Sequence, residues 1–170
     1  MSPQSLRSKV EQWVRKIGST PVEIQDPQAE WHLQIDYPTH SAHPIHIVSP
    51  KGKADAIVIV SALGVGPEHL EVFEELDDDA KADFAWELRR TLNVIDVDFQ
   101  LDGIKKEDDC PTRLQLSVTR YEDGLNLDSF ARSVGAVYKT ELNAVLLVQR
   151  LLGPKGLGGG GRFDFKRLGY

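Results

Sequence analysis

Three histidines stand at intervals of three residues in the first third of the chain, at His40, His43 and His46. Neutral imidazoles that gather at one place bind zinc, copper or nickel, and Asp36 could add an oxygen ligand. Two prolines in this stretch indicate a loop that runs into a strand, where this spacing does not bring the rings to one face. Solvated loop histidines are therefore the favoured interpretation, and we expect no metal or other cofactor.

Three aspartates, Asp96, Asp98 and Asp102, alternate with apolar residues, so the spacing predicts that they share one face of a strand. Paired carboxylates there could transfer protons or bind a divalent cation. Polar residues at every second position are also what a solvent-facing sheet surface requires. A solvated or partner-facing surface is therefore the favoured interpretation.

Other catalytic motifs are incomplete in this sequence. Gly64-Val65-Gly66 lies between a predicted strand and a helix start, where backbone amides could hold a phosphate, but the rest of the dinucleotide and phosphate-loop motifs does not follow. The sequence contains no Gly-x-Ser-x-Gly motif, and acidic neighbours disfavour a reactive thiolate at the single cysteine, Cys110. We therefore expect a protein that is not an enzyme.

Length and charge limit the class of protein. The 170 residues suit one compact domain, and 20 basic against 26 acidic residues give a net charge of −6, which disfavours nucleic-acid binding. Apolar runs are far shorter than the roughly 20 residues that cross a bilayer, and the N-terminus does not resemble a secretory signal. One cysteine cannot form an internal disulfide, so we expect a cytoplasmic protein.

Hydrophobic periodicity predicts the elements that must position these residues. A period of 3.6 residues predicts helices over 2–18, 67–92 and 126–152, and the acidic stretch 77–79 leaves open whether the middle region is one helix or two. Apolar runs predict strands over 31–37, 45–48, 56–60, 95–101 and 114–118. The order α-β-β-β-α-β-β-α predicts an α+β fold, with a five-stranded, mostly antiparallel sheet and helices on one face. Residues 1–153 form this single domain, and we expect the glycine-rich tail, 154–170, to be flexible.

The element order, the element lengths and the terminal apolar helix, over about Leu6 to Leu152, resemble the type III secretion chaperone-like fold. This fold includes the YbjN-like proteins and an uncharacterised prokaryotic family of similar size. Its members are commonly small, acidic, cytoplasmic homodimers that bind a segment of a partner protein. The resemblance therefore implies a non-catalytic protein-binding domain, but it supplies no functional residues to transfer.

Two surfaces are candidates for such binding. The second half of the last helix is apolar nearly all round, which predicts a homodimer interface at Leu142, Val145, Leu146, Val148, Leu151 and Leu152. An acidic run is either a solvated helix face or a surface that attracts a basic partner, formed by Glu71, Glu74, Glu75, Asp77, Asp78 and Asp79. We expect the partner to be a protein or peptide segment, with no nucleic acid and no membrane.

Two other functions stay open. One is a metal-dependent or small-molecule enzyme that uses the His40, His43 and His46 cluster. The other is a ligand-sensing regulatory domain with a pocket between the sheet and the middle helical region, near Trp31, Trp86 and Phe99.

Overall fold

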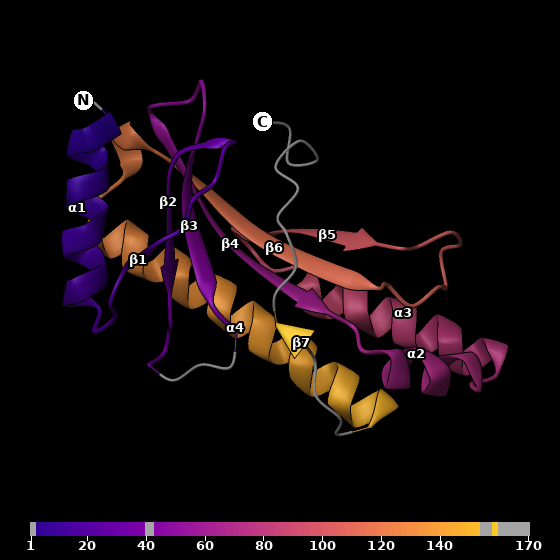
Figure 1. Ribbon diagram of the computed structural model, residues 1–170. Helices are drawn as coiled ribbons and strands as arrows, with labels where there is room; N and C mark the ends of the chain where they lie inside the picture. Colours follow the sequence, from indigo (N-terminus) through magenta and orange to yellow (C-terminus); the bar gives the residue numbers. More distant parts are fainter. Residues whose placement is uncertain (1–2, 40–42, 154–157, 160–170) are drawn as a thin grey trace.

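The computed structural model describes residues 3–39, 43–153 and 158–159, and its helices lie against one face of a twisted sheet (Figure 1). Within these residues the helices are α1 (Pro3–Lys16), α2 (Pro67–Glu74), α3 (Asp78–Leu92) and α4 (Leu127–Leu152), with a 3-10 turn η1 (Glu122–Gly124). The strands are β1 (Val22–Glu23), β2 (Ala29–Ile35), β3 (Ile45–Pro50), β4 (Ala56–Gly64), β5 (Asp98–Asp102), β6 (Arg113–Tyr121) and β7 (Gly158–Gly159). None of these helices combines the length and apolar character needed to cross a bilayer.

The sheet has the strand order β1-β2-β3-β4-β6-β5, with antiparallel pairing throughout. The predicted α+β fold and antiparallel arrangement are confirmed. The prediction of five strands is wrong, because β1 also pairs with β2 and β7 pairs with the end of β4. Both additional strands contain two residues, too few for an alternating pattern to reveal them.

The acidic stretch at 77–79 separates two helices. Asp77 is the N-cap of α3, and its side chain accepts a hydrogen bond of 2.8 Å from the backbone amide of Ala80. This bond satisfies one of the free amides at the helix start. The last helix begins with a capping box between Asn126 and Ser129, and it ends at Gly153, as the sequence predicts.

The predicted strand over 95–101 begins later than expected. Asp96 has a left-handed backbone conformation, with φ of 69°, so the chain turns before β5 starts at Asp98. The Asp96 carboxylate lies 3.8 Å from the Arg120 guanidinium, and Ile95 is 91% exposed. Asp96 therefore does not share a strand face with Asp98 and Asp102, and that prediction is wrong.

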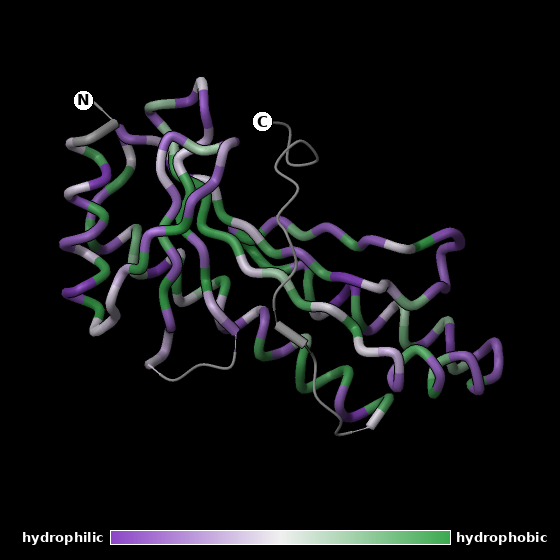
Figure 2. Tube along the Cα trace, viewed as in Figure 1, coloured by the Kyte–Doolittle hydropathy of each residue, from purple (hydrophilic) through white to green (hydrophobic). Residues whose placement is uncertain are grey.

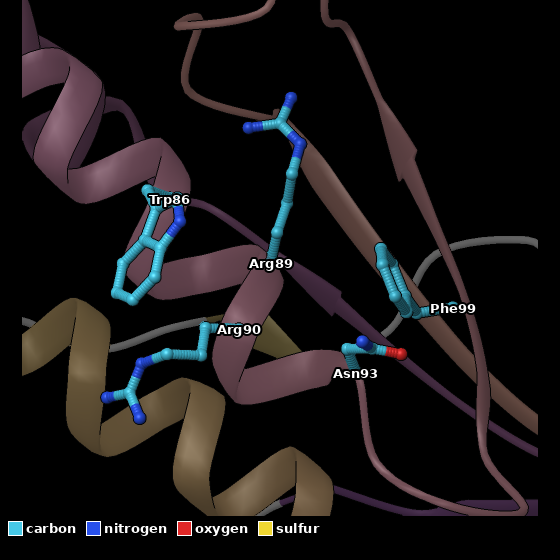
Figure 3. Close-up of a pocket in the computed structure, with 5 residues that line it drawn as sticks. All are labelled: Trp86, Arg89, Arg90, Asn93 and Phe99. Carbon is cyan, nitrogen blue, oxygen red and sulfur yellow. The ribbon is translucent and has the colours of Figure 1, made fainter.

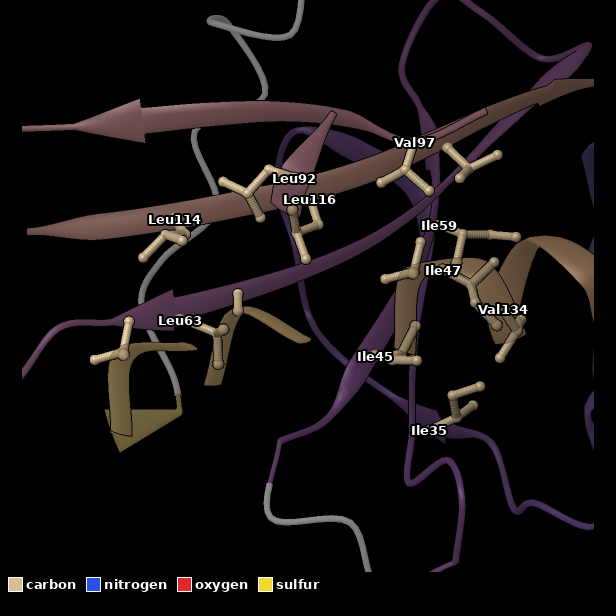
Figure 4. Packing of buried hydrophobic residues seen from close by; sticks show 14 of the residues in the cluster. Ile35, Ile45, Ile47, Ile59, Leu63, Leu92, Val97, Leu114, Leu116 and Val134 are labelled. Carbon is tan, nitrogen blue, oxygen red and sulfur yellow. The ribbon is translucent and has the colours of Figure 1, made fainter. Parts of the chain in front are cut away.

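The main hydrophobic core lies between the helices and one face of the sheet (Figure 4). On β4, Ile57, Ile59 and Leu63 belong to this core, while Val58 and Val60 belong to a second, smaller cluster on the opposite face. Figure 2 accordingly shows long hydrophobic stretches through the central strands. A strand that is buried on both faces is what the continuous apolar run of β4 predicts.

Candidate functional site

A pocket of about 510 Å³ lies between α3 and the edge strand β5 (Figure 3). Trp86, Arg89, Arg90 and Asn93 line it from α3, and Phe99 lines it from β5. The four α3 positions follow the i, i+3, i+4, i+7 spacing that forms one stripe along a helix. The sequence predicted a pocket near two of these residues, Trp86 and Phe99.

Trp31 does not take part in this pocket. It is 5% exposed and belongs to the main core, because it shares a face of β2 with the core residues Leu33 and Ile35. Arg89, Arg90 and Asn93 were not predicted. Their spacing from the exposed Trp86 on a helix was the signal that could have found them.

The two arginines of the pocket differ in their partners. The Arg90 guanidinium lies 5.4 Å from the centroid of the Trp86 ring and donates a hydrogen bond of 2.6 Å to the Glu87 carboxylate. Arg89 donates to the backbone carbonyl of Ala85 at 3.1 Å, and no carboxylate in the described part of the chain pairs with it. The Arg89 guanidinium thus keeps donors that can bind a carboxylate or a phosphate.

The predicted interface on α4 divides into a buried part and an exposed part. Val148 and Leu152 are buried in the main core, and Val145 is partly buried against it. Three leucines of the set are exposed: Leu142, Leu146 and Leu151. Leu146 also lines a hollow of about 330 Å³ between α3 and α4, together with Glu87, Arg90 and Arg150.

The predicted acidic surface lies on α2 and the start of α3. All six of its carboxylate residues are exposed: Glu71, Glu74, Glu75, Asp77, Asp78 and Asp79. Two of them already have structural partners, since Asp77 caps α3 and the Glu74 carboxylate lies 3.8 Å from the Lys81 ammonium. The remainder form an exposed anionic face.

A buried chain of hydrogen bonds joins Asp26, His32 and His46 on the sheet face opposite the helices. Nδ1 of His32 lies 3.0 Å from the Asp26 carboxylate, and Nε2 of His32 lies 2.8 Å from Nδ1 of His46. Burial lowers the pKa of both histidines, and together with nearby His32 it lowers the pKa of His46 to about 3. At neutral pH both rings are uncharged, so His32 donates to Asp26 and His46 donates to His32.

This arrangement changes the interpretation of the histidine cluster. His46 lies in β3 and is 9% exposed, so the prediction of a solvated loop position is wrong for this residue. His43 is partly buried, which lowers its pKa, and His40 lies outside the described residues. Within the ranges that the structure describes, no three His, Cys, Asp or Glu side chains gather closely enough to hold one metal ion.

The remaining candidates from the sequence, Cys110 and Gly66, lie at a buried position and at the start of a helix. Cys110 is buried, and burial together with nearby Glu74 and Asp109 raises the pKa of its thiol to about 12. Gly66 is the N-cap of α2, and its carbonyl accepts hydrogen bonds from the backbone amides of His69 and Leu70. Glu141, which no sequence pattern singled out, is a buried residue of α4 that faces β4, where Ser61 donates a hydrogen bond to it.

Comparison with known proteins identifies similar chains. A family model described as "Uncharacterized conserved protein (DUF2299)" matches residues 6–148. The crystal structure of an uncharacterized protein from Methanothermobacter thermautotrophicus is 30% identical, with a TM-score of 0.76, and the match covers 89% of this chain and 99% of that chain. YbjN from E. coli is 16% identical, with a TM-score of 0.44 over 88% of this chain and 90% of that chain. No curated protein matches the chain, and the type III secretion chaperone-like resemblance stays a prediction.

Proposed function

The chain belongs to the DUF2299 family of uncharacterized conserved proteins, and we propose that it is a non-catalytic protein-binding domain that acts as a homodimer. The observation that supports this proposal is the exposure of Leu142 and Leu146, which are 39% and 54% exposed and lie one turn apart on α4. Exposed apolar side chains grouped on one helix face gain stability when a partner covers them. We also propose a cytoplasmic location, in keeping with a single, buried cysteine.

Charges around these leucines favour a second copy as the partner. Glu87, Arg90 and Arg150 line the hollow beside Leu146, so both signs of charge occur on the same surface. In a two-fold dimer the same surface meets itself, and a glutamate of one copy can face an arginine of the other. The leucines would then supply burial, and the charges would fix the orientation.

The strongly perturbed titratable groups support a role without catalysis. Cys110, His46 and Glu141 are buried, and the residues that line the pocket between α3 and β5 include none of them. A general acid or base must reach the substrate within hydrogen-bond distance.

The acidic surface on α2 and α3 is a second proposed contact, for a basic partner.

The experiment that tests this function is native mass spectrometry combined with sedimentation analysis of the full chain. We expect a dimer for the wild type and a monomer for Leu146→Asp, because a charge in the interface is not compensated. Val22→Asp is the matched control, since Val22 is similarly exposed, at 53%, but lies in β1. A monomeric wild type, or a dimer that survives Leu146→Asp, would contradict the proposal.

A further inference from the structure

We propose that an extended acidic peptide binds along the outer edge of β5 and places a carboxylate against Arg89. The inference rests on the proposed function in taking a protein segment as the ligand. It uses the side of α3 that faces β5, whereas the dimer contact uses the hollow between α3 and α4.

The edge of β5 supplies the backbone of the site. β5 pairs with β6 along one side, with Phe99 opposite Leu116 and Leu101 opposite Leu114, and no described strand pairs along its other side. An exposed strand edge presents amides and carbonyls that an incoming strand can bind. The incoming strand would lie about 4.8 Å from β5 and direct every second side chain toward the helices.

The pocket between α3 and β5 lies on that helix side. Phe99 stands opposite Leu116, which belongs to the main core, so both side chains point to the face that the helices cover. In Figure 3 the Arg89 side chain extends from α3 between the Trp86 and Phe99 side chains. A peptide side chain directed into this pocket meets two aromatic rings and a guanidinium.

Charge selects the peptide. Arg89 pairs with no carboxylate among the described residues, whereas Glu87 neutralises Arg90. A planar guanidinium with unused donors binds a carboxylate in two parallel hydrogen bonds. Asp98 is exposed on the opposite face of β5, so a basic residue next to the acidic one completes the recognition. The favoured peptide is therefore an acidic segment that directs Asp or Glu toward Arg89, with a single basic residue next to it that faces Asp98.

Selection from a displayed library of random dodecapeptides on the full-length protein tests the inference. Enriched peptides are then labelled, and their affinities are measured by fluorescence anisotropy for the wild type, Arg89→Gln and Arg132→Gln. Arg132 is the matched control because it is an exposed arginine on α4 whose partner is Asp128. We expect Asp or Glu in the enriched peptides and binding weaker by about tenfold or more for Arg89→Gln alone.

A second set of probes tests the strand pairing. Methylation of every second backbone amide of an enriched peptide should abolish binding in one register and leave it unchanged in the other. No enrichment above the Arg89→Gln protein, equal affinity for both proteins, or indifference to methylation would overturn the inference. Because Leu146→Asp tests the dimer independently, a wild-type dimer that binds none of the peptides would contradict the peptide site alone.

Discussion

Two buried titratable groups lie on opposite faces of the same sheet, and their surroundings move their pKa values in opposite directions. Glu141 lies on α4 and faces Ser61 of β4, and burial raises its pKa to about 7 although the Ser61 hydrogen bond lowers it. His46 lies on the other face, where burial, followed by the nearby His32, lowers its pKa to about 3. The common cause is desolvation, which disfavours the charged form of both an acid and a base.

The difference between the two groups sets opposite pH dependences. The raised pKa of Glu141 contributes stability that is fully present below its unfolded value of 4.5 and is lost as the pH rises through about 7. The lowered pKa of His46 contributes stability that is present above its unfolded value of 6.5 and is lost as the pH falls through about 3. Between pH 4.5 and 6.5 the two slopes oppose each other, which predicts a plateau of stability.

Replacing His46 is expected to have the largest effect on the pH dependence of stability. The free energy of unfolding of the wild type should fall by on the order of 4 kcal/mol between pH 6.5 and 3 through His46. His46→Gln keeps a donor toward His32 but cannot gain a proton, so the variant and the wild type should be about equally stable above pH 6.5, and the variant should become the more stable one as the pH falls toward 3. Urea unfolding at a series of pH values measures the free energy of unfolding of both proteins. If the two curves of free energy against pH run parallel, His46 does not titrate as this comparison requires.

Replacing Glu141 should have a somewhat smaller effect on the pH dependence of stability. Glu141→Gln keeps a polar partner for Ser61 and cannot ionise, so at pH 8 it should be more stable than the wild type by about 3 kcal/mol. Below pH 4.5 the two proteins should be equally stable. Glu71→Gln, on the exposed face of α2, is the control and should leave the curve unchanged. The same urea series decides the matter, since a stabilisation that does not depend on pH contradicts a protonated Glu141.

The smallest expected effect concerns the end of the histidine chain. The Asp26 carboxylate raises the pKa of His32 against the stronger effect of burial. Asp26→Asn should therefore lower that pKa further and cost about 1 to 2 kcal/mol of stability at pH 7, because a charged acceptor becomes a neutral one. NMR titration of the His32 ring checks the pKa, and an unchanged titration would mean that Asp26 does not interact with the ring in solution.

Much of the fold could be predicted from the sequence, because burial follows the periodicity of apolar residues. The helices and the longer strands lie where the pattern places them. The sequence left open whether 67–92 holds one helix or two, and in the structure Asp77 caps the second of two helices. The exposed and buried leucines of α4 could not be separated, since the width of its buried stripe depends on the helices that pack beside it.

The buried polar groups were harder to predict than the pocket. Trp86 and Phe99 stood out as aromatic residues near the sheet, and they do line one pocket. The contact between His32 and His46 depends on strand register, which places His46 opposite Gln34 and His32 opposite Val48. A diagonal contact of this kind leaves no local signal in the sequence, because shifting one strand by one residue would move the ring to the other face.

The position of β6 between β4 and β5 has a consequence for the order of events during folding. Its register joins Ala56 to Tyr121 and Gly64 to Arg113, so the centre of the sheet closes only after α2, α3 and β5 have been synthesised. Pairing between segments so far apart in the chain is slow, because a long loop must close first. The apolar strand β4 therefore emerges from the ribosome with one edge unpaired, and that interval is when the nascent chain is most exposed to aggregation.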